Sequence, residues 1–400
     1  MISPQLQVAV DVGCRWHRVA VGDVAGELLE EFGVEHNAMG LADFFARIER
    51  LRVKFGWPVA VAMEGYNGWA RPLDRQVLRR GWRLYNVNNL KLARYKEIFP
   101  APSKSDAIDT RRMLELFRLR GQLRVARNVL QEVAPVPVEN DKLKRLTRRR
   151  RQLVDEKGRV LNRLQADLQA VSPGLLTITG EADNLWFLSL LACREDLRKI
   201  AGLRRSTLLS LEGVGRKYAS VIQAWQKQAV FSPDAEWAGP MIVIDAQRVL
   251  ELKGQIQALD RAIAALVERS EVARRIDTIP GFGNTCSGEL AGEIGTLERF
   301  ASEASLAVYL GMATLDNRSG DSEGAKPPRQ VNVRAKAAMM VAVARHVEQV
   351  SASRVFYEKK RAQGKTHNQA VRALGRHVVR VIWSMLKNAR DYELRPAARA

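Results

Sequence analysis

Near its start the chain reads Leu6-Gln-Val-Ala-Val-Asp-Val-Gly13, a mostly apolar run that ends close to a carboxylate. A second run of the same kind, Val59-Ala-Val-Ala-Met-Glu-Gly65, ends on Glu64. Short continuous apolar runs are typical of buried strands, so Asp11 and Glu64 are expected at two strand ends. Single acids at such places are also common as caps and solvated edges, so this pair alone does not define a site.

Two more acids stand three residues apart in Lys104-Ser-Asp-Ala-Ile-Asp-Thr-Arg-Arg112. The stretch is typical of a helix start, where Asp106 and Asp109 would project from one helix face. Two carboxylates at strand ends and two on a helix supply the oxygen ligands that hard divalent cations take. A metal site of this kind stabilises the attacking and leaving oxygens in phosphodiester chemistry. The four acids are therefore the predicted catalytic and metal-binding residues, with Mg²⁺ as the expected ion.

Residues 5 to about 120 alternate strand and helix signals. Strands are expected at 6–12, 17–22, 28–35, 58–64 and 82–87, and helices at 40–54, 67–80, 88–96 and 105–119. Three early strands followed by strand–helix alternation predict a mixed sheet with an antiparallel section, in the order of a ribonuclease H-like domain. An actin-like ATPase opens in the same way, but the second glycine-rich phosphate loop that it needs is not found in the sequence.

The charge of the chain indicates a polyanionic partner. Lys and Arg total 64 against 44 acids, a net charge of +20, and cations that neutralise phosphates release condensed counterions. The sequence shows no apolar run near 18 residues and no secretory signal, so we expect no membrane association. Its three cysteines have no metal or disulfide spacing. These features predict a nucleic-acid-binding protein of the cytoplasm.

Two segments, 139–172 and 245–275, carry apolar residues at helical spacing. Leu146, Leu153 and Val160 recur every seven residues in the first, and residues 252–266 repeat at intervals of four and three in the second. Such seams predict coiled-coil helices that pair with each other or with a second protomer. The first segment also carries a basic run, for which DNA phosphate contact competes with a merely solvated face: Arg145, Arg148, Arg149, Arg150 and Arg151.

Two short segments, 211–219 and 279–287, place a Gly-x-Gly turn between helices. They resemble helix–hairpin–helix turns, in which backbone N–H groups at a helix N-terminus meet a DNA phosphate. The second copy fits better and makes Gly281 and Gly283 candidate DNA contacts, although such a turn often only ends a helix.

A polar loop at 317–330 precedes a helix from about 332. A serine in a flexible, basic-flanked loop can present its hydroxyl to a phosphate, although most loop serines have no such role. Ser319 and Ser322 are the serines of this loop, and Arg318, Arg334 and Lys336 flank them.

Taken together, these motifs resemble the DEDD-type transposases of the insertion-sequence one-ten family, which includes the pilin-gene DNA invertases. The acids occur in the family's order, ending in Lys-Ser-Asp-Ala-Ile-Asp109. The C-terminal half adds Ile279-Pro-Gly-Phe-Gly283, Phe300, Tyr309-Leu-Gly311, Arg318-Ser-Gly320, Tyr357 and Gly364-Lys365. The resemblance covers nearly the whole chain. It departs at Met312-Ala-Thr-Leu315, where the family usually has a proline, and at Gln330-Val-Asn-Val-Arg-Ala-Lys336, where the family usually has a Lys-Gly-Asn turn before a helix.

The resemblance implies a ribonuclease H-like domain of the Holliday-junction-resolvase type and a helical C-terminal domain with a nucleophilic serine. On the family pattern that serine is Ser319, and Ser322 is the alternative. It also implies a structured non-coding guide RNA, a homo-oligomer (dimer or tetramer) and a bacterial, nucleoid-associated location.

We therefore expect an α/β ribonuclease H-like domain at 1–125, a helical coiled-coil region with a basic arm at 139–275, and a helical C-terminal domain at 276–395. The predicted function is a Mg²⁺-dependent DNA transposase or recombinase that works through a phosphoserine. A metal-dependent, structure-specific endonuclease and a non-enzymatic nucleic-acid-binding protein are the alternatives. The basic residues and glycines named above, together with Lys104, are the expected nucleic-acid contacts.

Overall fold

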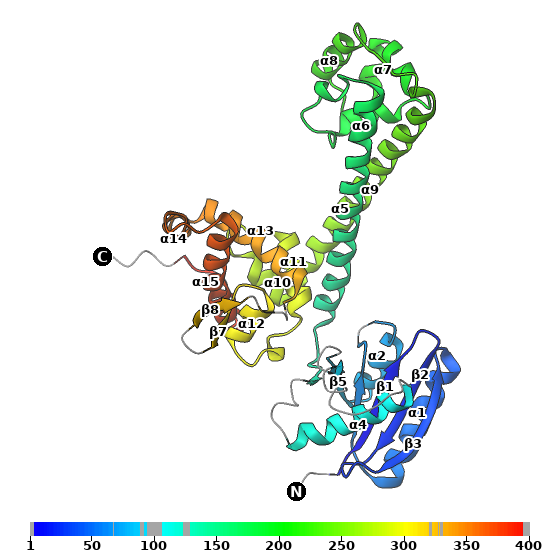
Figure 1. Cartoon of the computed structure of the whole chain (residues 1–400), viewed down its shortest axis with the longest axis vertical. Helices are drawn as coiled ribbons and strands as arrows, with labels where there is room; N and C mark the ends of the chain where they lie inside the picture. The colour runs from blue at the N-terminus through cyan, green and yellow to red at the C-terminus, as the bar shows by residue number, and fades with distance from the viewer. Residues whose placement is uncertain are drawn as a thin grey trace. The chain divides into compact units, whose positions relative to one another are not determined.

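The structure is a computed structural model that describes residues 4–66, 68–88, 92–93, 106–122, 129–319, 322–326, 328 and 331–394. The chain divides into two compact units, residues 1–135 and 136–400. The first is an α/β unit and the second is almost entirely helical (Figure 1).

A six-stranded mixed sheet forms the first unit. Its strands are β1 (Leu6–Val12), β2 (Trp16–Gly22), β3 (Leu28–Glu35), β4 (Val59–Met63), β5 (Arg83–Val87) and β6 (Leu130–Glu132), in the order β3-β2-β1-β4-β5-β6. The β1, β2 and β3 strands pair antiparallel, β1, β4 and β5 pair parallel, and β6 returns antiparallel to β5. This order confirms the predicted mixed sheet with an antiparallel section. The three-residue β6 was not predicted, because a strand that short shows no alternation.

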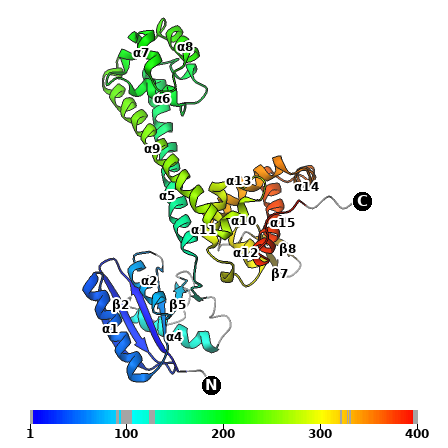
Figure 2. The ribbon, with the colours of Figure 1, turned by 180° about the vertical axis from the view of Figure 1, so that it is seen from behind.

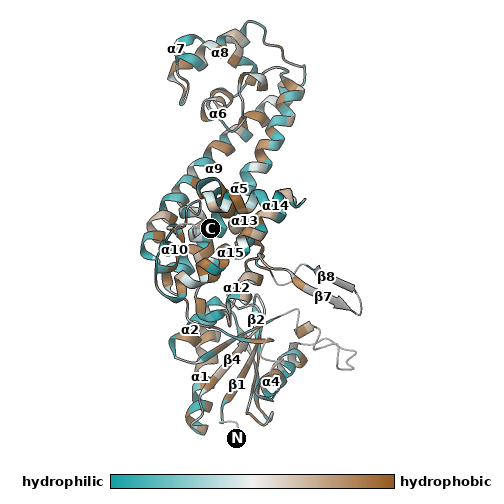
Figure 3. Cartoon of the chain, turned by 90° about the vertical axis from the view of Figure 1, so that its left-hand side faces the viewer, coloured by the Kyte–Doolittle hydropathy of each residue, from teal (hydrophilic) through white to brown (hydrophobic). Residues whose placement is uncertain are grey.

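Alternating side chains give the sheet two different faces. Val8 and Val10 face the first core with α1 (Ala38–Phe55) and α2 (Arg71–Arg79). Ala9 and Ala62 lie in the second core with α4 (Asp106–Gln122), where small side chains let the helix approach the sheet. Figure 3 shows the hydrophobic colour along β1 and β4, as expected for strands covered on both faces.

Two long helices, α5 (Val138–Val171) and α9 (Ala235–Arg269), pack along each other in the second unit (Figures 1 and 2). Ion pairs join Arg150 to Asp260 and Arg163 to Asp245, so the two helices run antiparallel. The predicted pairing of the two segments therefore occurs within one chain, while their supercoiling stays a prediction. Between α5 and α9 the chain forms three short α-helices and two 3₁₀-helices (labelled η): η2 (Leu176–Ile178), α6 (Leu185–Ala192), η3 (Leu197–Gly202), α7 (Arg205–Ser210) and α8 (Arg216–Gln226). They share one hydrophobic core with the C-terminal part of α5 and the N-terminal part of α9.

A second group of helices follows α9. It contains α10 (Glu271–Asp277), α11 (Asn284–Ile294), η4 (Leu297–Arg299), α12 (Glu303–Tyr309), α13 (Val333–Gln349), α14 (Ser351–Ala362) and α15 (His367–Lys387), with a hairpin of β7 (Leu315–Ser319) and β8 (Ser322–Lys326) between α12 and α13. Apolar residues of α11, α12, α13 and α15 form its core.

The predicted elements of the first unit agree with the structure to within a few residues, apart from the expected helix 88–96, most of which lies outside the described residues. The expected loop at 317–330 is wrong for the backbone, since residues 315–319 and 322–326 pair as strands. Gly320-Asp321, between those strands, is typical of a two-residue hairpin connection, but the polar composition concealed this signal. Among the described helices, none is long and apolar enough to cross a membrane.

Candidate active site

The sheet brings Asp11 and Glu64 together. The β1 and β4 strands are parallel neighbours with Val10 opposite Met63, so the two acids follow side by side at the carboxyl ends of the strands. The Glu64 N–H donates to the Val10 carbonyl at 3.3 Å, which continues the pairing to the acids themselves. Both acids are half-buried and line one cavity of about 320 Å³. Two hard oxygen donors in one cavity fit a divalent cation.

Helix α4 carries the other two acids. Asp109 is buried, with 7% of its surface exposed, and its carboxylate lies 4.0 Å from Arg112. The helix packs against β1 and β2, over the face that holds Ala9 and therefore Asp11. The side chain of Asp106 lies outside the described residues, as does the whole of Lys104. Within the described part of the chain, no three His, Cys, Asp or Glu side chains form a group that could hold a metal.

Two residues of β2 were not predicted from the sequence: Arg18, beside Asp11, and His17, which is opposite Val12 and faces the other side of the sheet. Arg18 is the cross-strand partner of Asp11, so the two side chains share a face of the sheet. His17 is fully buried, and its Nε2 lies 2.8 Å from Nδ1 of His36. Burial, and then the charge of His36, lower the pKa of His17 to about 4. Counting residues across the hairpin turn would have placed Arg18 opposite Asp11.

The β7–β8 hairpin carries both candidate serines. Its register places Ser319 directly opposite Ser322 at the end of the ladder. Their side chains and that of Arg318 lie outside the described residues, so the choice of nucleophile stays a prediction. On the following helix, Arg334 is exposed, whereas Lys336 is half-buried and its side chain lies against Gly311.

Three arginines of the basic arm bind carboxylates of the same unit. Arg148 pairs with Glu293 and Arg151 with Glu289, each through two hydrogen bonds of 2.6–3.0 Å, and Arg150 pairs with Asp260. Phosphate contact by these three arginines stays a prediction, and each guanidinium would have to meet a phosphate beside the carboxylate it already binds or in place of it. Arg145 and Arg149 are exposed on the same helix and keep the predicted role.

The Gly-x-Gly turn at 281–283 lies between α10 and α11. Gly281 has a φ of +88°, and a Cβ there would lie 2.5 Å from the backbone nitrogen of His346. Close packing on α13 thus explains this glycine without DNA. Gly283 is exposed immediately before α11 and keeps its predicted role at a helix N-terminus. At the other copy, a Cβ on Gly213 would meet the Trp186 backbone at 3.0 Å.

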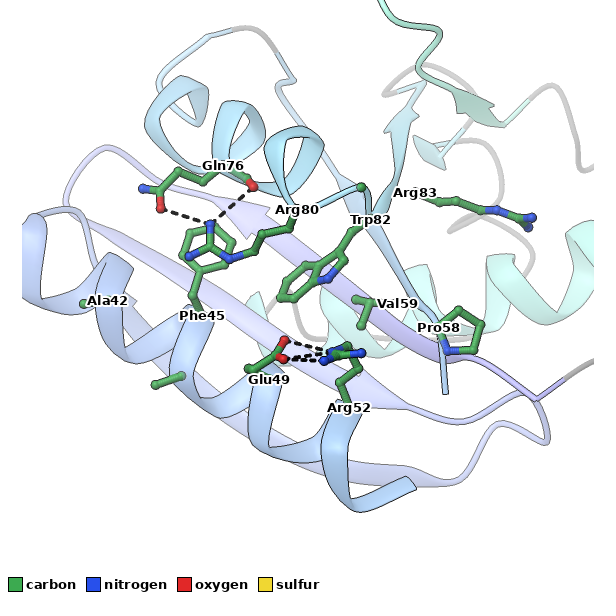
Figure 4. A pocket seen from close by; sticks show the side chains of 12 residues that line it. Ala42, Phe45, Glu49, Arg52, Pro58, Val59, Gln76, Arg80, Trp82 and Arg83 are labelled. Carbon is green, nitrogen blue, oxygen red and sulfur yellow. Dashed lines mark hydrogen bonds and ion pairs between the residues drawn. The ribbon is translucent and has the colours of Figure 1, made fainter. Parts of the chain in front are cut away.

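A larger cavity, of about 880 Å³, lies in the first unit (Figure 4). It lies at the end of the sheet opposite to the one that carries Asp11 and Glu64. It borders Pro58 and Val59, where β4 begins, and Arg83, where β5 begins. Arg80 lies 3.9 Å above the ring of Phe45 in its wall. The cavity has none of the four predicted acids in its lining, so its size does not indicate the site of the chemistry.

Two family models match the chain, and both describe transposases. A transposase model of the DEDD type found in IS110 matches residues 8–173, and the model of the IS116/IS110/IS902 family of transposases matches residues 273–358. The chain therefore belongs to the IS110/IS116 family of insertion-element transposases.

Full-length relatives agree with these matches. The 43.6 kDa protein of insertion element IS110 from Streptomyces coelicolor is 27% identical over 363 residues, covering 88% of this chain and 87% of the relative. The 44.8 kDa protein of IS116 from Streptomyces clavuligerus is 25% identical, covering 98% and 97%. The 42 kDa protein of IS900 from Mycobacterium paratuberculosis is 27% identical, covering 96% of each chain.

Proposed function

We propose that the chain is an insertion-sequence transposase that cuts and rejoins DNA strands through a phosphoserine intermediate, with Mg²⁺ as its cofactor. The observation that carries the proposal is the pairing of Asp11 and Glu64 in one cavity at adjacent strand ends. Asp109 lies on the helix that covers the same sheet face, and the family is that of transposases. Carboxylates in this arrangement can bind a divalent cation that contacts the phosphodiester to be cleaved.

The acids Asp11, Glu64, Asp106 and Asp109 would hold the metal, which when bound neutralises charge on the scissile phosphate. The Oγ of Ser319 forms a bond to phosphorus, and the bond from phosphorus to the leaving sugar oxygen breaks. A general base takes the serine proton, and the leaving oxygen gains a proton. The phosphoserine keeps the ester bond until a hydroxyl of the exchanged strand attacks it and releases the serine.

The proposed partners are DNA, a structured guide RNA and further copies of the chain in a dimer or tetramer. The net charge of +20 supports a nucleic-acid partner, and the guide RNA and oligomer rest on the resemblance alone. Within the second unit we propose a helical arm region at 139–275 and a transposase domain at 276–395, each with a core of its own.

Trapping the covalent intermediate on a nicked suicide substrate tests the chemistry. Mass spectrometry of the linked peptide should find DNA on Ser319, and Ser319→Ala should abolish the adduct while DNA binding is retained. Ser322→Ala is the matched control, since that serine is the cross-strand neighbour of Ser319, and we expect it to keep most activity. Asp11→Asn and Glu64→Gln should lose both adduct and cleavage, and so should the wild-type protein without divalent metal.

The outcomes separate the alternatives. Cleavage that needs metal but yields no adduct would mean a structure-specific endonuclease that activates water. DNA binding without any cleavage would mean an architectural protein whose acids only cap helices. An adduct on Ser322 would move the nucleophile to that serine.

A further inference from the structure

The segment that carries both serines is closed at its base. Tyr309 is the last residue of α12, and Asn332 is the N-cap of α13. The Asn332 backbone N–H donates to the Tyr309 carbonyl at 2.9 Å. This hydrogen bond joins the two ends of the segment between α12 and α13. The β7–β8 hairpin lies within this closed segment.

Glu293, near the end of α11, contacts both residues that close this segment. Its side chain is fully buried. The Asn332 Nδ2 donates to Glu293 Oε2 at 2.7 Å and to the Tyr309 hydroxyl at 2.7 Å. The Tyr309 hydroxyl in turn donates to the Glu293 carbonyl oxygen at 2.8 Å. Glu293 therefore binds both ends of the segment that carries the hairpin. Both side-chain amide hydrogens of Asn332 and the hydroxyl hydrogen of Tyr309 have acceptors.

Arg148 of α5 balances the buried charge. Its Nε and Nη2 donate to the two carboxylate oxygens of Glu293 at 2.6 and 2.8 Å, a bidentate pair that fixes the direction of the carboxylate. Burial would raise the pKa of Glu293, but the bonds from Arg148 and Asn332 hold it below its usual value. The carboxylate is therefore charged at neutral pH and accepts bonds from both partners.

The backbones of α5 and α11 touch at the same place. A Cβ on Gly292, beside Glu293, would lie 2.5 Å from the backbone nitrogen of Lys144. Only glycine permits this approach without a shift of one helix. The position of Glu293 is therefore tied to the backbone of α5, and through Asn332 and Tyr309 so is the base of the hairpin.

We propose that Glu293, Arg148, Asn332 and Tyr309 form a positioning clamp that sets the serine hairpin relative to helix α5. The effect of this clamp on catalysis rests on the proposed function, because the clamp would act by holding the segment that carries the two serines. Misplacement of a nucleophile by about 1 Å can cost about 100-fold in rate.

The chain offers a matched control for this clamp. Arg151 and Glu289 form the same bidentate pair between the same two helices, with distances of 3.0 and 2.7 Å. Glu289 is also buried, and the two arginine side chains are equally exposed, at 38%. In the described part of the chain, Glu289 has no hydrogen bond to Tyr309 or Asn332, so Glu289→Gln weakens the joint between helices and leaves the clamp intact.

Two variants open the clamp with little other damage. Asn332→Ser keeps an oxygen that can cap α13, as Asn332 does for Arg334 and Ala335, but removes the Nδ2 amide group that donates to Glu293 and to the Tyr309 hydroxyl. Tyr309→Phe removes only the bridging hydroxyl. Each variant should be compared with Glu293→Gln and with the Glu289→Gln control.

Hydrogen exchange of peptides from 310–331 is the first readout, because it does not depend on catalysis. We expect faster exchange in Asn332→Ser, Tyr309→Phe and Glu293→Gln, and wild-type exchange in Glu289→Gln. The second readout is the rate of adduct formation, which should fall about tenfold to 100-fold in the three clamp variants, with DNA affinity unchanged.

Unchanged exchange in Asn332→Ser and Tyr309→Phe would overturn the clamp whatever the chemistry. Equal losses in Glu289→Gln and Glu293→Gln would overturn it too, since a general loosening of α5 on α11 would then explain both. An absent wild-type adduct, with the exchange pattern as expected, would instead remove the proposed serine chemistry and leave the clamp as a structural feature.

Discussion

At the residue scale, His17 makes the first unit sensitive to acid. It is fully buried in β2, and its pKa lies at about 4, whereas an unfolded histidine titrates near 6.5. Between those values the unfolded chain takes up a proton that the folded unit excludes. The free energy of unfolding should therefore fall as the pH falls from about 6.5 to about 4, by at most about 1.4 kcal/mol per pH unit for one proton.

Replacing His17 by leucine should flatten this slope. Hydrogen exchange of the β2 amides, measured between pH 7 and pH 4.5 and corrected for the intrinsic rate, reports the opening free energy of the first unit by itself. His367→Gln is the control, since that histidine is exposed in the second unit. Equal slopes in the wild-type protein and His17→Leu would show that another group takes up the proton.

Residue identity alone predicted the acids but not their surroundings. Asp11 and Glu64 were predictable because an apolar run ending on a carboxylate is a local pattern. The partners of Arg148 and Arg151 were not, because Glu293 and Glu289 are well over a hundred residues away along the chain. A run of arginines looks the same in sequence whether it meets solvent, DNA or carboxylates of the same fold.

At the element scale, the strands of the first unit and the long helices were predictable from their periods, because each pattern persists over several turns or residues. The β7–β8 hairpin and β6 were not, since both are short and polar and are defined by their pairing partners. The antiparallel pairing of α5 with α9 was left open by the sequence, because an apolar seam does not say which helix covers it.

The seam between α5 and α9 should be essential to the second unit. Ile256 is 9% exposed and lies in one core with Leu153 and Val160 of α5. Ile256→Asp would bury a charge without a partner, and should destabilise the unit by more than the roughly 0.5–3 kcal/mol of an ordinary substitution. Urea unfolding followed by circular dichroism measures this loss, and Gln257→Asp, on the exposed side of the same helix, should change little.

Light scattering on the same pair of variants tests whether the seam also serves association. Because α5 already covers Ile256 within one chain, we expect loss of folded protein rather than a folded species of lower mass. A well-folded Ile256→Asp protein with halved mass would mean that the seam holds protomers together instead.

At the scale of the whole molecule, the excess of cations should control nucleic-acid affinity through salt. A net charge of +20 implies a steep fall of affinity with salt concentration, because each phosphate contact releases counterions. Not every arginine contributes equally, since a guanidinium bound to a buried carboxylate such as Glu293 is less available to phosphate. Exposed and paired arginines of α5 should therefore differ in their effect on the salt dependence.

Removing the two exposed arginines, in an Arg145→Gln, Arg149→Gln double variant, should weaken binding to all DNA sequences alike. The slope of log affinity against log salt should become shallower by up to about 1.8, from about 0.9 for each lost contact. Arg150→Gln is the control, because Arg150 lies on the same helix but pairs with Asp260. Fluorescence anisotropy with labelled duplexes at several salt concentrations measures the slopes. If the slope becomes shallower by as much in Arg150→Gln as in the double variant, DNA draws the paired arginines away from their carboxylates. If the slope is unchanged in both variants, the DNA binds a surface other than this face of α5.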